Sequence, residues 1–296
     1  QRLERALGAA HPLLQDAARR EDALRLRIAY LDAWWAERVL ALRAEDLATV
    51  EAWLEVTRVR VREGVDPAFQ VTLVAGELAK ARLDMAQARA ERIRTWRILQ
   101  AWADLPSEPQ PLADPDPLPS LPPLDFETLR AGSPLHQALR AEAELDLQAL
   151  RLEAARTQAR WSLRASHARE GEERVTRLGF ALRLPRPGEG TILRRATEAR
   201  VRTRSEEAAL ALAELDARLQ ALLDRWSDPS SDPPPDAFLS ALRALGLRLS
   251  EGRERPSEAL PLRRQLLEGH LARLQRDYQR QRDAAELQAF LPQVTP

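Results

Sequence analysis

The 296-residue sequence contains no cysteine, a single lysine, 11 glycines and only 5% aromatic residues. Without cysteine, the chain can form neither a disulfide nor a thiolate metal site. So few glycines and aromatic residues argue against a compact two-layer α/β body. The longest uncharged runs are also too short for a transmembrane helix. These absences leave long helices as the main building element.

Charge and composition agree with that expectation. Lys80 is the only lysine among 45 basic residues, and 45 acidic residues bring the formal net charge to zero. A protein that grips phosphates with arginine rarely carries as many acids, so nucleic acid is not expected as a partner. A chain with 44% hydrophobic and 30% charged residues, dominated by Ala, Leu, Glu and Arg, is typical of long or coiled helices.

The chain repeats itself at an offset of 188 residues. Glu63-Gly64 is followed by Leu99-Gln100-Ala101-Trp102, and Glu251-Gly252 is followed at the same interval by Leu287-Gln288-Ala289-Phe290. A fixed long period indicates a duplicated structural unit. In each copy a helix ends at a glycine and a returning helix stops near a Leu-Pro pair. The sequence therefore predicts two long helical hairpins in tandem.

The residues around each glycine suggest how the helices end and begin. Gly64 can adopt the left-handed conformation that ends a helix. Asp66 is expected to cap the returning helix, with Pro67 at its first position. In the second copy Ser257 is expected to cap the last helix, which leaves Pro261 in its first turn, where it breaks no internal hydrogen bond.

Composition divides the chain into three segments. Residues 1–106 form the first helical-hairpin repeat, and residues 107–124 a proline-rich linker. Eight prolines fall between residues 106 and 123, which excludes helix and favours an extended connector. Residues 125–296 form the second repeat, in which a proline-rich interruption from Ser227 to Asp236 breaks a helix whose counterpart in the first repeat is continuous.

Within the second repeat the hydrophobic period changes from helix to strand over about residues 160–185. Trp161, Leu163 and Ala165 alternate with polar residues, and a second alternating run includes Phe180 and Leu182. The sequence therefore predicts an antiparallel β-hairpin. Each arm has about the ten residues that a tilted membrane-spanning strand needs. The alternative interpretation is a small soluble hairpin folded against a helix.

The order of these elements resembles that of the TolC-like outer-membrane efflux proteins. The resemblance rests on the Gly64 turn, a returning helix that ends in Leu-Gln-Ala-Trp before Leu-Pro, the proline connector, a hairpin that ends in Gly-Phe-Ala-Leu-Arg-Leu-Pro, and the Gly252 turn. It implies a mainly α fold in which two tandem helical hairpins form the protomer of an α-barrel. It also implies that the short β-hairpin contributes to a trimeric β-barrel.

The resemblance further implies a function and a set of partners. The protein would be the exit channel of a tripartite efflux or secretion system, which passively exports small molecules or metal ions from the periplasm to the exterior. It would lie in the cell outer membrane with most of the chain in the periplasm. Its partners would be two further copies of itself, a periplasmic adaptor protein, an inner-membrane pump and the lipid of the outer membrane.

Three groups of residues follow as candidate sites. The hairpin tips expected to contact the adaptor are Arg62, Gly64, Val65, Asp66, Gly252, Arg253 and Glu254. The strand residues expected to face lipid are Leu178, Phe180, Leu182 and Leu184. The strand residues expected to face the lumen are Arg160, Arg164 and Arg183.

One feature departs from the family pattern. Family members carry a strand hairpin in each repeat, and at the 188-residue offset Gln1 falls on Glu189, immediately after the hairpin of the second repeat. Either a first hairpin precedes Gln1 or the protein lacks one. In the second case a trimer would have six strands, below the eight of the smallest single-chain outer-membrane barrels.

The sequence offers no enzyme chemistry. The four histidines are scattered without metal-ligand spacing, so no catalytic residue, metal site or cofactor is expected. The acidic pairs Glu45-Asp46 and Glu206-Glu207 are interpreted as solvated partners of arginines on helix faces. Composition alone leaves one alternative function open, a soluble periplasmic coiled-coil scaffold or adaptor-like protein without membrane insertion.

Overall fold

The computed structural model describes residues 2–118, 125–156, 160–170, 173–183, 189–227 and 237–292. The chain forms two compact units, and each draws on both sequence repeats. Unit 1 comprises Gln1–Arg19, Asp125–Gln220 and Phe290–Pro296, and unit 2 comprises Arg20–Leu124 and Ala221–Ala289. None of the helices in the described ranges has an apolar stretch long enough to cross a membrane.

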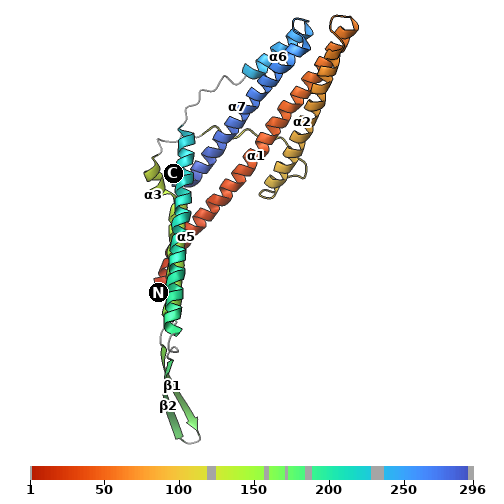
Figure 1. The fold of residues 1–296 in the computed structure, drawn as a ribbon. Helices are drawn as coiled ribbons and strands as arrows, with labels where there is room; N and C mark the ends of the chain where they lie inside the picture. Colours follow the sequence, from red (N-terminus) through yellow and green to blue (C-terminus); the bar gives the residue numbers. More distant parts are fainter. Residues whose placement is uncertain are drawn as a thin grey trace. The chain divides into compact units, whose positions relative to one another are not determined.

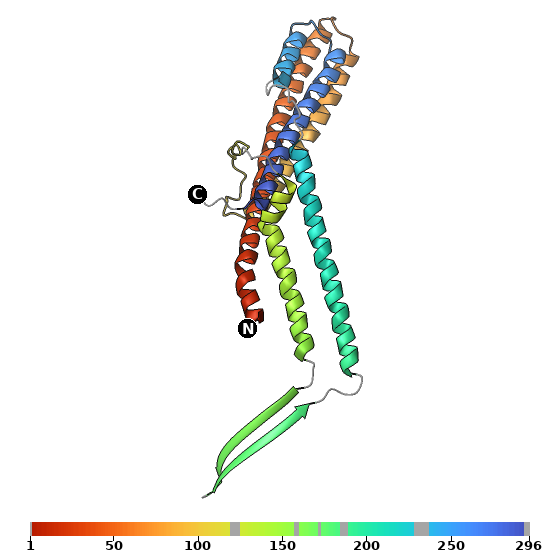
Figure 2. The same cartoon turned by 90° about the vertical axis from the view of Figure 1, so that its left-hand side faces the viewer.

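Unit 2 is built on the two helical hairpins that the repeat predicts. α1 (Arg2–Arg62) turns into α2 (Phe69–Gln100), and α6 (Ala237–Ser250) turns into α7 (Pro256–Phe290). Both turns lie at the same end of this unit (Figures 1 and 2). All four helices contribute to one buried core, which consists of Val50, Trp53, Leu54, Val74, Leu78, Ala81, Leu245, Leu249, Ala259 and Leu260.

The spacing of these core residues explains why the helices pack side by side. Buried positions recur every three or four residues along each helix, as in Val74, Leu78 and Ala81 of α2. Such spacing gives each helix one narrow apolar stripe, which is removed from water only when another helix covers it. Each fully buried leucine or valine contributes about 1.5–3 kcal/mol to that association.

Two prolines lie inside helices of the structure, Pro12 in α1 and Pro261 in α7. α7 begins at Pro256, so Pro261 is its sixth residue and lies beyond the first turn. The prediction that Ser257 caps this helix is therefore wrong. Pro256 itself supplies the fixed φ that suits a first helical position, and the missing N–H of Pro261 costs the helix one internal hydrogen bond.

The proline-rich connector packs against unit 2. From residue 106 to residue 118 it forms neither helix nor strand, and its backbone carbonyls accept hydrogen bonds from helix side chains. Trp96 Nε1 donates to the carbonyl of Pro106 at 3.0 Å, and the hydroxyl of Tyr30 donates to that of Ala113 at 2.7 Å. Leu112 packs against two apolar clusters of the bundle. The described part of the connector therefore belongs to the packed body of unit 2.

Unit 1 contains α3 (Phe126–Gly132), α4 (Pro134–Arg156) and most of α5 (Glu189–Trp226). The sequence does not predict α3, because seven residues are too few to show a helical period. Asp125 caps it by accepting a hydrogen bond of 3.0 Å from the backbone N–H of Thr128. Fully buried His136 of α4 lies 3.1 Å from Asp216 of α5 and links these two helices. Burial lowers the pKa of His136, against the opposing effect of Asp216.

Between α4 and α5 the chain forms the predicted β-hairpin. β1 (Arg160–Glu170) and β2 (Glu173–Arg183) pair antiparallel as a two-stranded sheet (Figure 2). The register aligns Arg160 with Arg183 at one end and Glu170 with Glu173 at the other. The change of period from helix to strand is therefore confirmed.

Candidate functional site

The first helical hairpin reverses at Gly64, whose φ is +75°. The N–H of Gly64 donates to the carbonyl of Val61 at 3.1 Å, and the N–H of Val65 donates to that of Arg60 at 2.8 Å. This pair of bonds is the Schellman motif, which satisfies carbonyls left free at a helix C-terminus. Glycine is needed at position 64 because it takes positive φ without a Cβ clash.

The second hairpin reverses in the same way at Gly252, whose φ is +77°. The N–H of Gly252 donates to the carbonyl of Leu249 at 3.1 Å, and the N–H of Arg253 donates to that of Arg248 at 2.9 Å. Each donor and each acceptor lies 188 residues after its counterpart in the first turn. The sequence repeat is therefore a repeat of backbone hydrogen bonds, and both glycines form the turns that it predicts.

Asp66 does not cap α2, so the capping prediction is wrong. Ala68 occupies the cap position, where no side chain makes a capping hydrogen bond. Asp66 is buried, and its carboxylate accepts two hydrogen bonds from Arg60, at 2.6 and 3.1 Å. This pairing holds the pKa of Arg60 above its usual value. Two charge-assisted hydrogen bonds from one guanidinium are together stronger than one hydrogen bond from a backbone N–H.

The second turn carries a corresponding but looser pair. Arg248 and Glu254 occupy the positions that match Arg60 and Asp66, and their charged atoms are 3.7 Å apart. The spacing of Arg60, Gly64 and Asp66 recurs in the sequence as Arg248, Gly252 and Glu254. This repeat could have revealed the Arg60–Asp66 ion pair, which the capping prediction overlooked.

The structure brings the two turns into contact. A Cβ atom added to Gly252 would lie 2.8 Å from Nη1 of Arg60, so the guanidinium of the first turn covers the glycine of the second. Nearby, Gln70 Nε2 of α2 donates to the hydroxyl of Ser257 in α7 at 3.1 Å. The predicted tip residues of both repeats therefore form one continuous region of unit 2.

The predicted tip residues differ in their exposure. Asp66 is buried and Glu254 is partly buried, and the exposed members are Arg62, Gly64, Val65, Gly252 and Arg253. Val65 in the turn and Phe69 and Leu73 at the start of α2 are exposed apolar residues, with exposed fractions of 61%, 59% and 40%. Phe69 and Leu73 are not among the predicted tip residues, although their four-residue spacing places them on one side of a helix. The first turn thus presents exposed apolar residues beside Arg62, and Arg253 is exposed at the second.

The register of the β-hairpin sorts the predicted strand residues into two faces. Residues directly opposite in an antiparallel pair lie on the same face, and neighbours along a strand alternate. Phe180 pairs with Leu163, and it shares its face with Leu178 and Leu182. Arg160, Arg164 and Arg183 share the other face. Phe180 is 66% exposed in the single chain. Leu184 lies outside the described residues.

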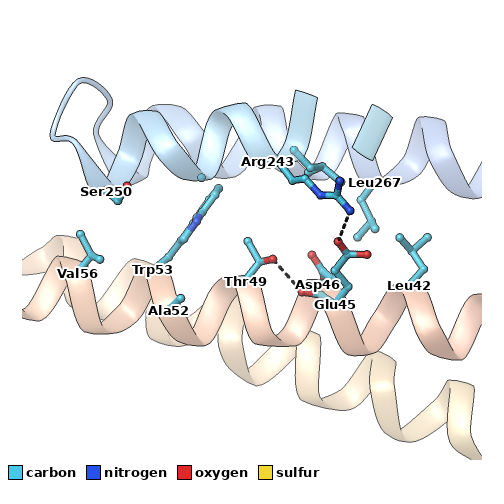
Figure 3. A pocket seen from close by; sticks show the side chains of 12 residues that line it. Leu42, Glu45, Asp46, Thr49, Ala52, Trp53, Val56, Arg243, Ser250 and Leu267 are labelled. Atoms are coloured by element: carbon cyan, nitrogen blue, oxygen red, sulfur yellow. Dashed lines mark hydrogen bonds and ion pairs between the residues drawn. The ribbon is translucent and has the colours of Figure 1, made fainter. Parts of the chain in front are cut away.

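A groove of about 270 Å³ lies between α1 and α6 of unit 2 (Figure 3). Trp53 extends across it, and its Nε1 lies 3.6 Å from the point where a Cβ on Gly246 would sit. Arg243 and Glu45 approach each other to 3.9 Å over this groove. The lining of the groove is mainly apolar, and it includes the exposed Arg243–Glu45 ion pair. Over the described ranges, no three His, Asp or Glu side chains gather where they could hold a metal ion.

No protein-family model and no curated protein matches this sequence. Solved structures do match. The outer-membrane channel OprN superposes with a TM-score of 0.68 at 19% sequence identity, over 97% of this chain and 69% of that one. The CmeC outer membrane channel of Campylobacter jejuni gives a TM-score of 0.75 at 13% identity, over 98% and 66% of the two chains. The outer membrane protein VceC of Vibrio cholerae gives 0.67 at 16% identity, over 97% and 75%.

These superpositions cover nearly all of this chain and two thirds to three quarters of the others. They therefore include both helical hairpins and the strand hairpin. The mainly helical architecture implied by the sequence resemblance is confirmed, and the chain has the fold of the TolC-like outer-membrane channels.

Proposed function

We propose that this protein is the outer-membrane exit channel of a tripartite exporter and passively conducts small molecules or metal ions from the periplasm to the exterior. The observation that carries this proposal is the superposition on outer-membrane channels over 97–98% of the chain. The described residues add no catalytic constellation that would favour an enzyme.

The strand hairpin supports a trimeric channel on physical grounds. A two-stranded hairpin alone has marginal stability and leaves both of its edges unpaired. Closure into a barrel removes those edges, and strands from further copies of the chain would supply the missing pairs. In this arrangement the face with Leu178, Phe180 and Leu182 contacts lipid, and the face with Arg160, Arg164 and Arg183 lines the lumen.

Replacement of Phe180 by arginine tests that orientation. Near the bilayer midplane an arginine on the lipid face costs roughly 2–4 kcal/mol, so the F180R variant should insert poorly. Gly179, its neighbour on the opposite face, provides the matched control, since G179R would add an arginine to a polar lumen. The measurement is the fraction of each variant in the outer-membrane pellet as a trimer. Equal insertion of both variants would contradict a lipid-facing Phe180.

The tip region is proposed as the docking surface for the periplasmic adaptor. Asp66 is too deeply buried to take part directly, so the contact falls to Arg62, Val65 and Arg253, with Gly64, Gly252 and Glu254 beside them. Phe69 extends this surface on the apolar side. A partner would therefore meet exposed apolar residues, Val65 and Phe69, beside exposed arginines, and it would need apolar residues and charge at the corresponding places.

Single cysteines test the docking surface without interference, because the chain has none of its own. V65C and R253C should crosslink to an adaptor in intact cells, whereas F180C on the strand hairpin should not. Capture of the adaptor from F180C and from neither tip would reverse the proposed orientation.

The mass of the purified protein distinguishes the channel from the soluble scaffold. A channel should require detergent and migrate as a trimer. A protein that remains monodisperse as a monomer or dimer without detergent would rule out the channel and leave a coiled-coil scaffold.

A further inference from the structure

A buried layer of charged side chains interrupts the apolar core of unit 2. Asp46 of α1, Glu77 of α2 and Arg263 of α7 each occupy a position between buried apolar residues of their own helices, and their side chains are only 5%, 8% and 4% exposed. The interpretation of Asp46 as a solvated partner on a helix face is therefore wrong. Its partner lies 217 residues away along the chain, beyond the reach of local sequence patterns.

Within this layer each charged side chain is hydrogen-bonded to a side chain of opposite charge. Arg263 donates to both carboxylate oxygens of Asp46, from Nε at 2.8 Å and from Nη2 at 2.6 Å. Its remaining Nη1 reaches Glu77 at 3.3 Å, and Glu77 also accepts from Nε of half-exposed Arg264 at 3.1 Å. The layer thus joins both helices of the first hairpin to the last helix of the second.

Other features of the fold fix each hairpin internally, whereas the further contacts between the hairpins, such as Arg60 with Gly252 and Gln70 with Ser257, are not bidentate ion pairs. The Schellman turns set how α1 pairs with α2 and how α6 pairs with α7. No short connection links the first hairpin to the second, because the chain from residue 101 to residue 236 intervenes. Their shared core is a regular apolar stripe, which tolerates a shift of one helical turn far better than a bidentate ion pair does.

We infer that the Asp46–Glu77–Arg263 layer sets the axial register between the two helical hairpins, so that their glycine turns end at the same level. A shift of one turn, about 5.4 Å, would leave a buried arginine and two buried carboxylates without partners. Other cross-hairpin hydrogen bonds also occur, such as Tyr278 with Asp32 and Arg27 with Gln288, but each has only one charged partner and those sites are only partly buried. The inference concerns packing within one chain and does not depend on a channel function.

Replacement of the whole layer by apolar residues tests the inference. The D46L/E77L/R263M variant removes all three charges together, so no buried charge is left unpaired, and such replacements are often neutral or stabilising. Cysteines at Gln70 and Ser257 report the native register, because these side chains are in contact. Cysteines at Leu73 and Ser257 report a shift of about one turn.

With a short thiol crosslinker on the full chain, the parent protein should give mainly the 70–257 product. The apolar variant should keep its helix content and thermal stability while the ratio of native to shifted product falls about tenfold. The matched control is E45Q/R243Q, which removes an exposed cross-hairpin ion pair beside the same layer. That control should give the parent ratio.

Two results would overturn the inference. An apolar variant that folds and gives only the 70–257 product would show that the rest of the core sets the register. An apolar variant that loses its helix content would show that the layer acts through stability and not through register. Either outcome leaves the proposed channel untouched, since trimer mass and membrane insertion measure that separately.

Discussion

The two glycine turns share one backbone conformation but place their ion pairs in different surroundings. Arg60 and Asp66 of the first turn are 13% and 2% exposed, whereas Arg248 and Glu254 of the second are 64% and 23% exposed. An exposed pair contributes about 0–1 kcal/mol, whereas removal of one partner from a buried pair costs about 3–5 kcal/mol. Glycine and backbone hydrogen bonds therefore determine the shape of a turn, and burial of its side chains determines how strongly that shape is held.

The largest expected effect comes from neutralising the acid of each turn. D66N leaves Arg60 buried without its counter-charge and should lower the free energy of unfolding by about 3 kcal/mol. E254Q in the second turn should lower it by less than about 1 kcal/mol, because water already solvates Arg248. Chemical denaturation followed by circular dichroism measures both. Equal losses would show that the two pairs do not differ as their exposure indicates.

An intermediate effect is expected when each turn glycine becomes alanine. Positive φ costs an alanine roughly 1–2 kcal/mol at either site. At Gly252 the new Cβ would also meet Arg60 at 2.8 Å, whereas nothing lies within 4 Å of a Cβ at Gly64. G252A should therefore lower the melting temperature more than G64A does.

Gly76 supplies the control for this comparison. It lies inside α2 with nothing within 4 Å of an added Cβ, so G76A should stabilise the protein by about 0.5–1 kcal/mol. If G64A proves more harmful than G252A, Arg60 does not cover the second glycine as described.

The two turns also show what sequence patterns can and cannot predict. Gly64, Gly252 and the offset between them were sufficient for the two hairpins, because helix termination by glycine depends on a few neighbouring residues. The alternation over β1 and β2 was likewise sufficient for the strand hairpin. These features are set locally, so a single sequence contains the information.

Features that depend on distant partners were missed. Asp66 before Pro67 has the local form of a helix start, but Arg60 across the turn takes its carboxylate. Asp46 has the local form of a solvated acid, but Arg263 of another helix buries it. Ser257 has the local form of a helix cap, but it accepts a hydrogen bond from Gln70 of another helix. In each case a contact formed only on packing outweighs the local preference.

The smallest expected effect is that of Q70M, which concerns the contact that joins the starts of α2 and α7. Gln70 is 2% exposed, and while its amide N–H bonds to Ser257, its Oε1 has no hydrogen-bond partner among the described residues. S257A would remove the acceptor and leave a buried donor unpaired, at a cost of about 1–3 kcal/mol. Q70M would remove that donor and the unpaired oxygen together, and should change stability by less than about 0.5 kcal/mol.

Loss of the Gln70 amide should thus lower the free energy of unfolding less than loss of the Ser257 hydroxyl. Chemical denaturation of the two single variants and the double variant tests this. Once Gln70 is methionine, loss of the Ser257 hydroxyl should cost almost nothing. A cost that persists in the double variant would mean that Ser257 stabilises α7 by another route.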